Sequence, residues 1–526
     1  MIVIGSGITG SNVCLELLKM GYHVELWDIG NEEKIKYDFS SNFIDVKKNL
    51  DLSLKTLIGE KDNNFPLPKD QKLFDLPLIR NYLLTNNEIK KEIDNADKFN
   101  IYQSNNIGGL ANGWGANSLP YSYSDIENLE INFEKFKISQ EKVFKEMNVS
   151  NVHDNINNEF NVPNLGNQNP IELDPRDNFL VRKYSQNEKF FFKEKFHLGK
   201  ARLAIENSNN SQSCKLLSNC LWGCSQKAIY NPIHHTLKKC KHFKTFHYFP
   251  NRKVLYFKIN ENKICEIIYI ENNEKKTKEL KEKVFLCTGA IQSGIIFNKT
   301  CINNNINLDK ITTGLMDTKT VKIVYLIPRF INHSLNYKSI QFNRLIGGMT
   351  EEFMGKNHYI HTEFLNLNSL FYQPIINAIP LPLTLAKNLF YNLYAGLGVC
   401  TYFLPDILEK SNKILPDKKS DKFKINYKFN KEINVLDRKI EKRIKKYLLK
   451  LSAIPLKTIR YDFGSGIHYA GTIPMGQGDT FPVSKFGEVK FMKDLHICDA
   501  SILPFLPSKP VSANAASIGH YVARNI

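Results

Sequence analysis

The stretch that decides the fold is residues 1–30, MIVIGSGITGSNVCLELLKMGYHVELWDIG. Residues 2–4 are apolar and predict a short buried strand. Residues 8–20 repeat apolar side chains with the period of a helix, and Gly21 predicts where that helix ends. Residues 22–28 predict a second strand. The order strand, glycine turn, helix, strand predicts a dinucleotide-binding unit at the start of the chain.

Three glycines between the first strand and the helix have the spacing G-x-G-x-x-G. We expect Gly5 to allow the tight turn, Gly7 to let the backbone approach a pyrophosphate, and Gly10 to let the helix pack on the strand. The first helical residues, Ile8 and Thr9, offer free N–H groups at the positive end of the helix dipole. These positions are therefore candidate cofactor-binding residues.

Asp28 ends the second predicted strand, 18 positions after Gly10. A carboxylate there can accept hydrogen bonds from the adenosine ribose hydroxyls, and it argues against a 2′-phosphate on that ribose. The loop itself does not decide between FAD and NAD.

A second glycine-rich segment, NNIGGLANGWGANSLPY, occupies residues 105–121. A flexible surface loop is the simple interpretation, but such loops seldom carry a tryptophan and flanking apolar residues. A loop pressed against a flat cofactor needs glycine wherever the backbone comes close. The candidate contacts are Gly109, Asn112, Gly113 and Trp114.

Residues 249–280 alternate like an antiparallel meander and lead into KEKVFLCTGAIQSG, residues 281–294. The latter predicts a strand at 284–287, a Thr-Gly-Ala turn and a helix start. Thr288 and Gly289 are candidate cofactor contacts in that turn, and we expect Val254 to lie where the backbone meets adenine.

Composition limits the class of protein. The 526 residues are too many for one ordinary core and predict two interlocked domains. The formal net charge is +18, but the lysines are scattered without a dense basic block, which argues against nucleic-acid binding. Attraction to anionic membranes or acidic saccharides stays open, beside the simpler interpretation of a biased composition on a solvated surface.

The start of the chain has no basic segment or cleavage site of a signal peptide. Most of the ten cysteines are dispersed in apolar contexts, which is typical of reduced thiols. We therefore expect a cytoplasmic protein.

Taken together, GSGITGS, GGLANGWGAN, VFLCTGAIQS and the C-terminal stretch from HYAGTIPMG to the end of the chain resemble the glucose–methanol–choline (GMC) oxidoreductases. The resemblance implies an α/β fold: a Rossmann-like FAD-binding domain formed from both chain ends, residues 1–304 and 456–526, with a lid-like segment at about 125–200. An α+β substrate-binding domain is inserted at 305–455, where no motif matches.

The resemblance also assigns roles to the C-terminal residues. It implies that His468 faces the flavin N5 as a catalytic base and that Asn514 completes a catalytic pair with it. Asp499 and Ala500 would reach the ribityl and pyrophosphate region, and Ala515 would also contact the cofactor. Some relatives tether FAD through a histidine in the glycine loop; here that position is Gly113, so we expect noncovalent FAD.

The activity implied is FAD-dependent oxidation of the CH–OH group of an alcohol, whether a sugar, a sterol or a lipid-linked alcohol. The electron acceptor stays open among O₂, a quinone and a protein. The alternatives are a dehydrogenase that passes electrons to a quinone or protein, and a non-catalytic flavin-binding scaffold in a biosynthetic complex. The oligomeric state is not decided.

Three further segments have more than one interpretation. Cys214, Cys220 and Cys224 match no ferredoxin or zinc spacing, so a structural loop with or without one disulfide is favoured over a cluster. Residues 364–405 hold one charged residue and predict a buried part of the substrate domain or an apolar surface for peripheral membrane contact, not a membrane span. Residues 435–451 predict an amphipathic helix whose basic face could meet phospholipid.

Overall fold

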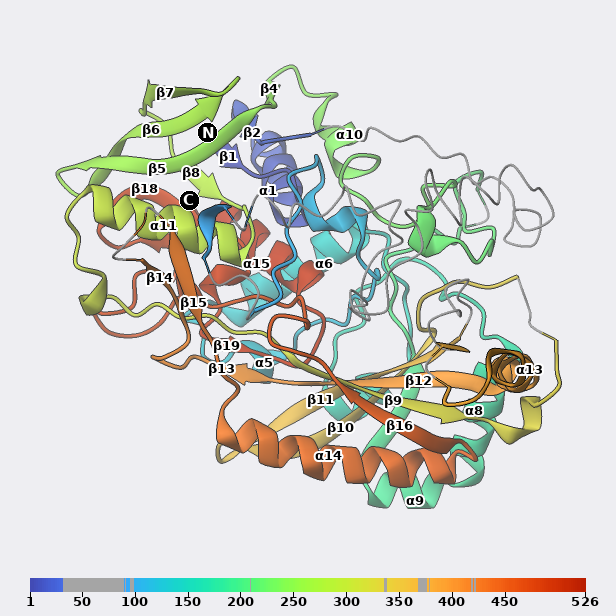
Figure 1. The fold of residues 1–526 in the computed structure, drawn as a ribbon. Coiled ribbons are helices and arrows are strands. Elements are labelled where there is room, and N and C mark those ends of the chain that lie inside the picture. Colours follow the sequence, from blue (N-terminus) through green and yellow to red (C-terminus); the bar gives the residue numbers. More distant parts are fainter. Residues whose placement is uncertain are drawn as a thin grey trace.

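The computed structural model describes residues 1–31, 89, 91–94, 99–208, 210–334, 338–367, 376–377, 379–417, 420 and 422–526. Two large sheets organise these residues, one in the upper and one in the lower half of Figure 1. The chain threads between the two sheets several times, and both termini lie with the upper sheet. The predicted α/β fold with two interlocked parts is confirmed.

The upper sheet has nine strands, and its central order is β4-β2-β1-β8-β18-β6-β5. The strands β1, β2, β4, β8 and β18 pair in parallel, while β5, β6 and β7 form the antiparallel meander predicted from the alternating sequence. The bounds are β1 Ile2–Ile4, β2 Val24–Trp27, β4 Phe246–Phe249, β5 Arg252–Asn260, β6 Lys263–Glu271, β7 Glu274–Glu279, β8 Val284–Leu286, β17 Glu488–Val489 and β18 Met492–Ile497.

Helices from distant parts of the sequence pack beside this sheet. Helix α1, Ile8–Lys19, follows β1 as predicted and ends before Gly21, whose φ of 88° only glycine adopts without strain. The C-terminal helix α15, Ser512–Arg524, packs against α1, and both chain ends therefore share one core. The other helices here are α5 Tyr123–Ile126, α6 Phe133–Glu146, α10 Thr236–Cys240 and α11 Ala290–Asn303.

The lower sheet is antiparallel, with the order β16-β9-β12-β11-β10-β3. Its strands are β3 Phe196–Lys200, β9 Lys319–Leu326, β10 Leu345–Phe353, β11 Lys356–Asn366, β12 Leu397–Leu404 and β16 Ile454–Arg460. The predicted limits of the inserted domain, 305–455, are too narrow for this sheet. The edge strand β3 comes from the segment that was predicted as a lid, and the other edge strand, β16, ends at Arg460. An antiparallel sheet can add edge strands from distant parts of the chain.

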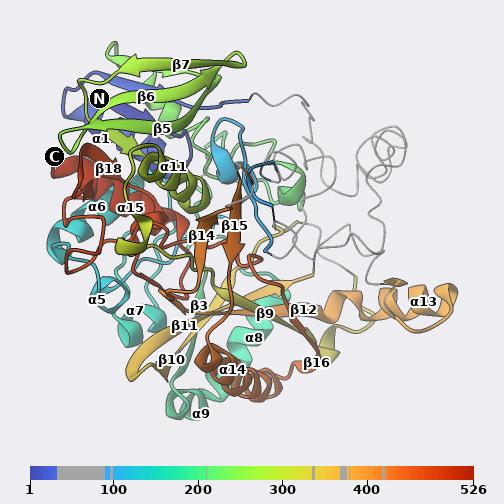
Figure 2. The same ribbon diagram turned by 60° about the vertical axis from the view of Figure 1, so that its left-hand side comes forward.

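One face of the lower sheet is covered by α14, Lys431–Lys450, and by α8 and α9, Pro175–Gln186 and Glu188–Lys193 (Figures 1 and 2). Helix α14 buries the apolar stripe predicted from its period, which comprises Leu436, Ile440, Ile444, Tyr447, Leu448 and Leu451. Several of its basic side chains pair with carboxylates of this protein, for example Lys439 with Glu351 and Lys446 with Glu194.

The apolar segment 364–405 divides between buried and exposed parts, and residues 368–375 and 378 lie outside the described residues. Strand β12 is buried, whereas α13, Leu383–Leu393, projects from the body and buries only Ala386 and Phe390 (Figure 2). No helix within the described ranges is long and apolar enough to cross a bilayer.

Smaller elements are α7 Asn155–Phe160, β13 Asp406–Ile407, β14 Lys413–Pro416, β15 Phe423–Asn426 and β19 Phe505–Leu506.

Candidate active site

A cavity of about 630 Å³ lies between the two sheets. The sequence-predicted cofactor residues line it almost completely: Gly5, Gly7, Ile8, Thr9, Asp28, Gly109, Asn112, Gly113, Trp114, Val254, Thr288, Gly289, Asp499, Ala500 and Ala515. His468 lines it as well. The structure therefore brings together residues from separate segments that were selected from the sequence one motif at a time.

The N-terminal turn presents backbone to the cavity. A Cβ at Gly5 would lie 2.6 Å from the carbonyl oxygen of Cys287, and Gly5 has a φ of 102°. Nothing lies within 4 Å of a Cβ built on Gly7, which is the N-cap of α1 and makes no side-chain cap hydrogen bond. The first N–H groups of α1 therefore face the cavity without a side-chain cap, as an anion site requires.

Gly10 does not line the cavity. A Cβ there would stand 1.8 Å from the carbonyl oxygen of Gly5, so a larger residue cannot be accommodated without moving the turn. Gly10 therefore allows α1 to pack closely on the N-terminal turn, as its place in the glycine spacing predicted.

Asp28 stands at the end of β2 and accepts a hydrogen bond from the Ser6 hydroxyl. Burial raises the pKa of this carboxyl to about 6, against the opposing effect of the Ser6 hydrogen bond. Bound hydroxyl donors would stabilise the ionised form and lower that pKa, since a hydrogen bond to a carboxylate favours its charge.

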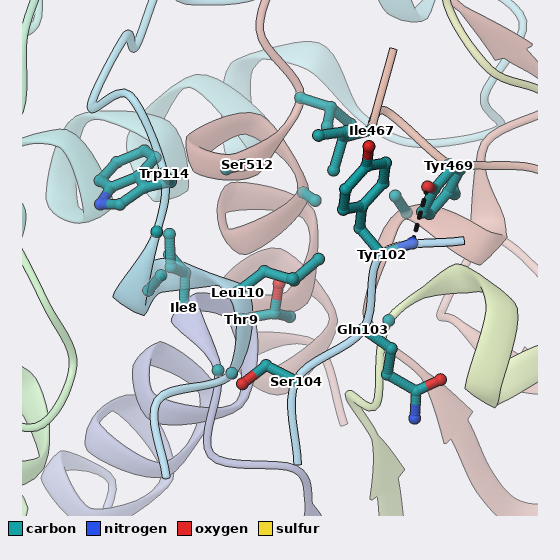
Figure 3. A pocket seen from close by; sticks show the side chains of 18 of the residues that line it. Ile8, Thr9, Tyr102, Gln103, Ser104, Leu110, Trp114, Ile467, Tyr469 and Ser512 are labelled. Atoms are coloured by element: carbon teal, nitrogen blue, oxygen red, sulfur yellow. Dashed lines mark hydrogen bonds between the residues drawn. The ribbon is translucent and has the colours of Figure 1, made fainter. Parts of the chain in front are cut away.

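The glycine segment forms a short 3₁₀ turn, η5 Gly109–Asn112, entered through Gly108 at a φ of 86°. Asn112 donates from Nδ2 to the carbonyl oxygens of Ile107 and Gly109, which fixes the turn. Trp114 donates from Nε1 to the carbonyl oxygen of Tyr230, 2.9 Å away. In Figure 3 Trp114 lies near Ile8, with Thr9 and Leu110 beyond it on the same side of the cavity.

Asp499 joins the C-terminal strand to the turn after β8. Its Oδ2 accepts from the backbone N–H of Gly289 and from the Ser293 hydroxyl, at 2.8 and 2.6 Å. Its Oδ1 accepts from the backbone N–H of Ser501. The carboxylate therefore holds two cavity walls together, and Ala500 beside it stands in the lining.

The loop that carries His468 is held in an unfavourable conformation. Ile467 has a φ of 60°, in the left-handed region that a β-branched residue rarely adopts. The buried Asp317 spans this residue: its Oδ2 accepts from the N–H of Gly466 and its Oδ1 from the N–H of His468, both at 2.9 Å. One carboxylate thus clamps the backbone on both sides of the strained residue.

The His468 side chain is fixed by two contacts. Its Nδ1 lies 3.0 Å from the Thr318 hydroxyl, and its ring packs 5.6 Å from the ring of Phe403. Burial lowers the pKa of His468 to about 4, although the nearby Glu363 carboxylate opposes this. The imidazole is therefore neutral at neutral pH and keeps a lone pair on one ring nitrogen.

Asn514 is not in the cavity, and the predicted pairing with His468 is corrected on this point. Its Oδ1 accepts from the N–H of Tyr121 and from Gln140, and its Nδ2 donates to the carbonyl oxygens of Leu119 and Pro510, at 2.8 to 2.9 Å. The side chain is fully buried. The amide is thus fully hydrogen-bonded within the protein, and two of its four bonds hold α15 against the chain at 119–121.

Other residues of the cavity carried no recognisable motif. They include Tyr102, Gln103 and Ser104 (Figure 3), and the strand residues Lys322, Glu363, Leu365, Thr401 and Phe403. The backbone N–H of Tyr102 donates to the Tyr469 hydroxyl oxygen, 3.0 Å away. Pairing between distant strands brings the other residues in, and one sequence does not reveal that register.

The cysteine loop lies beside the glycine segment. Cys214, Cys220 and Cys224 are free thiols that pack on an apolar cluster near Trp114. No group of three metal-ligating side chains occurs within the described part of the chain.

One family model matches the C-terminal part of the chain. Residues 420–519 match the family model "GMC oxidoreductase". The C-terminal region is therefore similar to that of the GMC oxidoreductases. The resemblance inferred from the motifs is thereby confirmed, and an oxidoreductase is supported.

The fold as a whole also has solved counterparts. A pyridoxine 4-oxidase from Mesorbium loti has a TM-score of 0.61 at 12% identity, covering 99% of this chain and 98% of that one. A formate oxidase variant of Aspergillus oryzae RIB40, described for its FAD modification, has a TM-score of 0.60 at 12% identity, covering 99% and 97%. The chain matches no curated protein sequence.

The residues around the N-terminal turn fit the FAD that the family uses. The glycine cradle leaves backbone open for a pyrophosphate, α1 presents unpaired N–H groups, and Asp28 supplies a ribose acceptor. The match to the GMC family model supports the predicted FAD cofactor.

Proposed function

We propose that this protein is an FAD-dependent oxidase of a primary or secondary alcohol, with noncovalent FAD and His468 as the base. The observation that carries the proposal is the position of His468: a neutral, half-buried imidazole lines the same cavity as the glycine turn that suits a dinucleotide. The enzyme that this supports oxidises a CH–OH group to a carbonyl.

His468 would remove the hydroxyl proton of the substrate. With Nδ1–H donating to the Thr318 hydroxyl oxygen, 3.0 Å away, Nε2 keeps its lone pair and serves as the acceptor. An alkoxide is a far better hydride donor than a neutral alcohol, so deprotonation by a positioned base lowers the barrier to oxidation. FAD, when bound, supplies the hydride-accepting centre.

Phe403 and the loop clamp keep the base in place. The Phe403 ring limits rotation of the imidazole, and the Asp317 carboxylate fixes the backbone N–H groups on either side of Ile467. Positioning of this kind contributes because a reacting group displaced by about 1 Å can lose about 10²-fold in rate.

The oxidase assignment is favoured over a dehydrogenase because the similar solved structures are oxidases. Noncovalent FAD is favoured because Gly113 offers no side chain for a tether. A flavin-binding scaffold without turnover would have no use for a clamped, neutral histidine in the cavity.

The test is anaerobic stopped-flow reduction of the FAD-loaded protein by alcohols, followed by admission of air. His468→Ala should slow flavin reduction by about 10²–10⁴-fold, the range for loss of a general base, with unchanged FAD content. His153→Ala, at an exposed position outside the cavity, is the matched control and should behave as wild type.

Unchanged reduction in the His468 variant would remove this residue from the mechanism. Fast reoxidation in air would support the oxidase; reoxidation only by a quinone would support the dehydrogenase. A wild type that takes up FAD and is reduced by no alcohol would favour the scaffold.

A further inference from the structure

Helix α14 lies at the outer surface of the lower half of the molecule and turns one line of side chains away from it (Figures 1 and 2). In a helix of about 3.6 residues per turn, residues spaced alternately four and three positions apart lie on one line. The line opposite the buried stripe of α14 comprises Lys431, Val435, Arg438, Lys442, Lys445 and Leu449. It is about 27 Å long, and all six residues are exposed or half-buried. We call these six residues the outer line.

The outer line carries positive charge that the protein does not neutralise. Cations on the flanks of α14 have carboxylate partners, as Lys439 has in Glu351. On the outer line itself, Lys445 pairs with Glu441 at 2.6 Å. The described residues offer no carboxylate to the other three cations, Lys431, Arg438 and Lys442. Like charges three or four positions apart on a helix repel one another, so this arrangement costs helix stability unless an anion meets it.

The acidic residues near the middle of α14 do not compensate these cations. Asp437 is buried and pairs with Lys319 and Arg460, on the side of the helix that faces the sheet. Glu441 pairs with Arg460 as well as with Lys445. The carboxylates are therefore occupied between helix and sheet, and the positive charge is left on the side that faces away from the protein.

Two apolar side chains stand among the cations of the outer line. Val435 has 70% of its surface exposed and Leu449 has 59%. The solvent-facing side of a surface helix ordinarily carries polar residues, and valine is a weaker helix former than the lysine or glutamate that could replace it. Folding therefore does not explain these two residues. Aliphatic side chains beside unpaired cations suit a surface that is negatively charged outside and apolar just beneath.

We propose that the outer line docks α14 onto an anionic lipid bilayer. The cations meet the anionic headgroups, and Val435 and Leu449 enter the apolar layer beneath them. A straight line of side chains suits a flat surface. A nucleic acid could also meet the cations, but single strands stack their bases on aromatic side chains, and the outer line has none. A second copy of the chain would present the same positive charge and be repelled.

Docking through α14 leaves the cavity on the other side of the lower sheet. Ile323 and Tyr402 belong to the core under α14, whereas their strand neighbours Lys322 and Thr401 line the cavity. Because successive residues of a strand point to opposite faces, the bilayer and the cavity lie on opposite sides of the sheet. The contact is therefore an anchor that does not deliver substrate from the bilayer, and it is independent of the proposed function.

The experiment is sedimentation of the FAD-loaded protein with vesicles of equal parts phosphatidylserine and phosphatidylcholine, beside vesicles of phosphatidylcholine alone. The wild type should sediment with the mixed vesicles only, and less as salt is added. Arg438→Gln combined with Lys442→Gln should weaken partitioning about 30-fold, since each basic residue near an anionic surface contributes about fivefold. The matched control, Lys244→Gln combined with Lys281→Gln, removes the same charge from exposed positions before β4 and β8 and should bind as wild type.

A second pair of variants tests the insertion of apolar side chains. Leu449→Gln should weaken partitioning about 10-fold, as expected when one leucine no longer leaves water. Leu385→Gln in α13, where the leucine has 56% of its surface exposed, is the control and should leave partitioning unchanged. All the variants should keep the FAD content of the wild type, because none of the substituted residues lines the cavity.

Three results would overturn the inference: no sedimentation with the mixed vesicles, equal weakening by the two double variants, or weakening by Leu385→Gln and not by Leu449→Gln. A short single-stranded RNA that binds as tightly as the mixed vesicles and is indifferent to Leu449→Gln would also overturn it, in favour of nucleic-acid binding. Each readout is a binding measurement without turnover, so the proposed function stands or falls separately.

Discussion

Replacing Asp317 by Asn tests whether the loop of His468 depends on the carboxylate clamp. Asp317 accepts from the N–H groups of Gly466 and His468 through its two oxygens, around the left-handed Ile467. Asparagine keeps one acceptor and turns an NH₂ group toward the other N–H. The variant therefore loses one hydrogen bond to a charged group, which is worth about 1.5–3 kcal/mol, and leaves an N–H unpaired.

The lost hydrogen bond should lower the fraction of molecules in which the loop holds His468 in its position. A change of about 1.5–3 kcal/mol lowers a conformer's relative population by about 10–150-fold, and the observed rate follows the competent fraction. We expect Asp317→Asn to slow anaerobic flavin reduction at pH 8 by about 10–100-fold. FAD content should not change, because the clamp touches none of the residues around the N-terminal turn.

The dependence on pH gives a second readout. Burial raises the pKa of Asp317 to about 7, against its hydrogen bonds to the loop. Between an unfolded value near 3.8 and about 7 the folded protein binds more protons than the unfolded chain, so this group's contribution to the free energy of unfolding falls as pH rises through that window. Asp317→Asn should remove this part of the pH dependence, measured by urea unfolding from pH 4.5 to 8.

Asp406→Asn is the matched control. Asp406 is also buried, with a pKa raised to about 7 by burial, and accepts from the Tyr427 hydroxyl at 2.6 Å and from the N–H of Asp317. It makes no hydrogen bond to the loop of His468. It should change stability and its pH dependence and slow reduction less than Asp317→Asn. Equal slowing in the two variants, or none in Asp317→Asn at pH 8, would refute the clamp.

Three other predictions concern the cofactor. Asp28→Ala should weaken FAD binding by about 10–100-fold, from the loss of a charge-assisted hydrogen bond to the ribose, while reduction of the loaded enzyme stays near the wild-type rate; titration of apoprotein with FAD measures it. Gly10→Ala should reduce both FAD content and folded yield, since its Cβ would stand 1.8 Å from the Gly5 carbonyl oxygen; thermal unfolding with and without FAD reports on both. Heat or acid should release all flavin into the filtrate, because position 113 is glycine; flavin retained by the denatured polypeptide would contradict noncovalent binding.

The parts of the site that could be predicted are those in which backbone geometry requires a particular residue type. Gly5 at a φ of 102° and Gly289 at 82° adopt conformations that other residues rarely take, so the turns are visible in the sequence as glycines at fixed spacing. Period 3.6 located α1 and α14, and period 2 located the β5–β6–β7 meander. These patterns are local, and each was sufficient on its own.

The strand residues of the cavity wall and the Asp317 clamp could not be predicted, because both depend on strand register and on contacts between distant segments. Glu363, Thr401 and Lys322 are separated by 38 and 79 residues in the chain and become neighbours only through the pairing of β11, β12 and β9. A slip of one residue would turn each side chain to the other face of the sheet. Asp317 is likewise 149 residues from Gly466.

Asn514 shows how a correct motif can still lead to the wrong residue. The segment after Ser508 does reach the cavity, but through Pro510, Val511, Ser512 and Ala515. In a helix that turns about 100° per residue, Asn514 lies about 200° from Ser512 and about 100° from Ala515, on the side that meets residues 119–121. The motif therefore predicted correctly that this helix reaches the cavity. The rotation of the helix about its axis determines which of its side chains line the cavity. Ser512 is thus the polar side chain that this helix brings to the cavity.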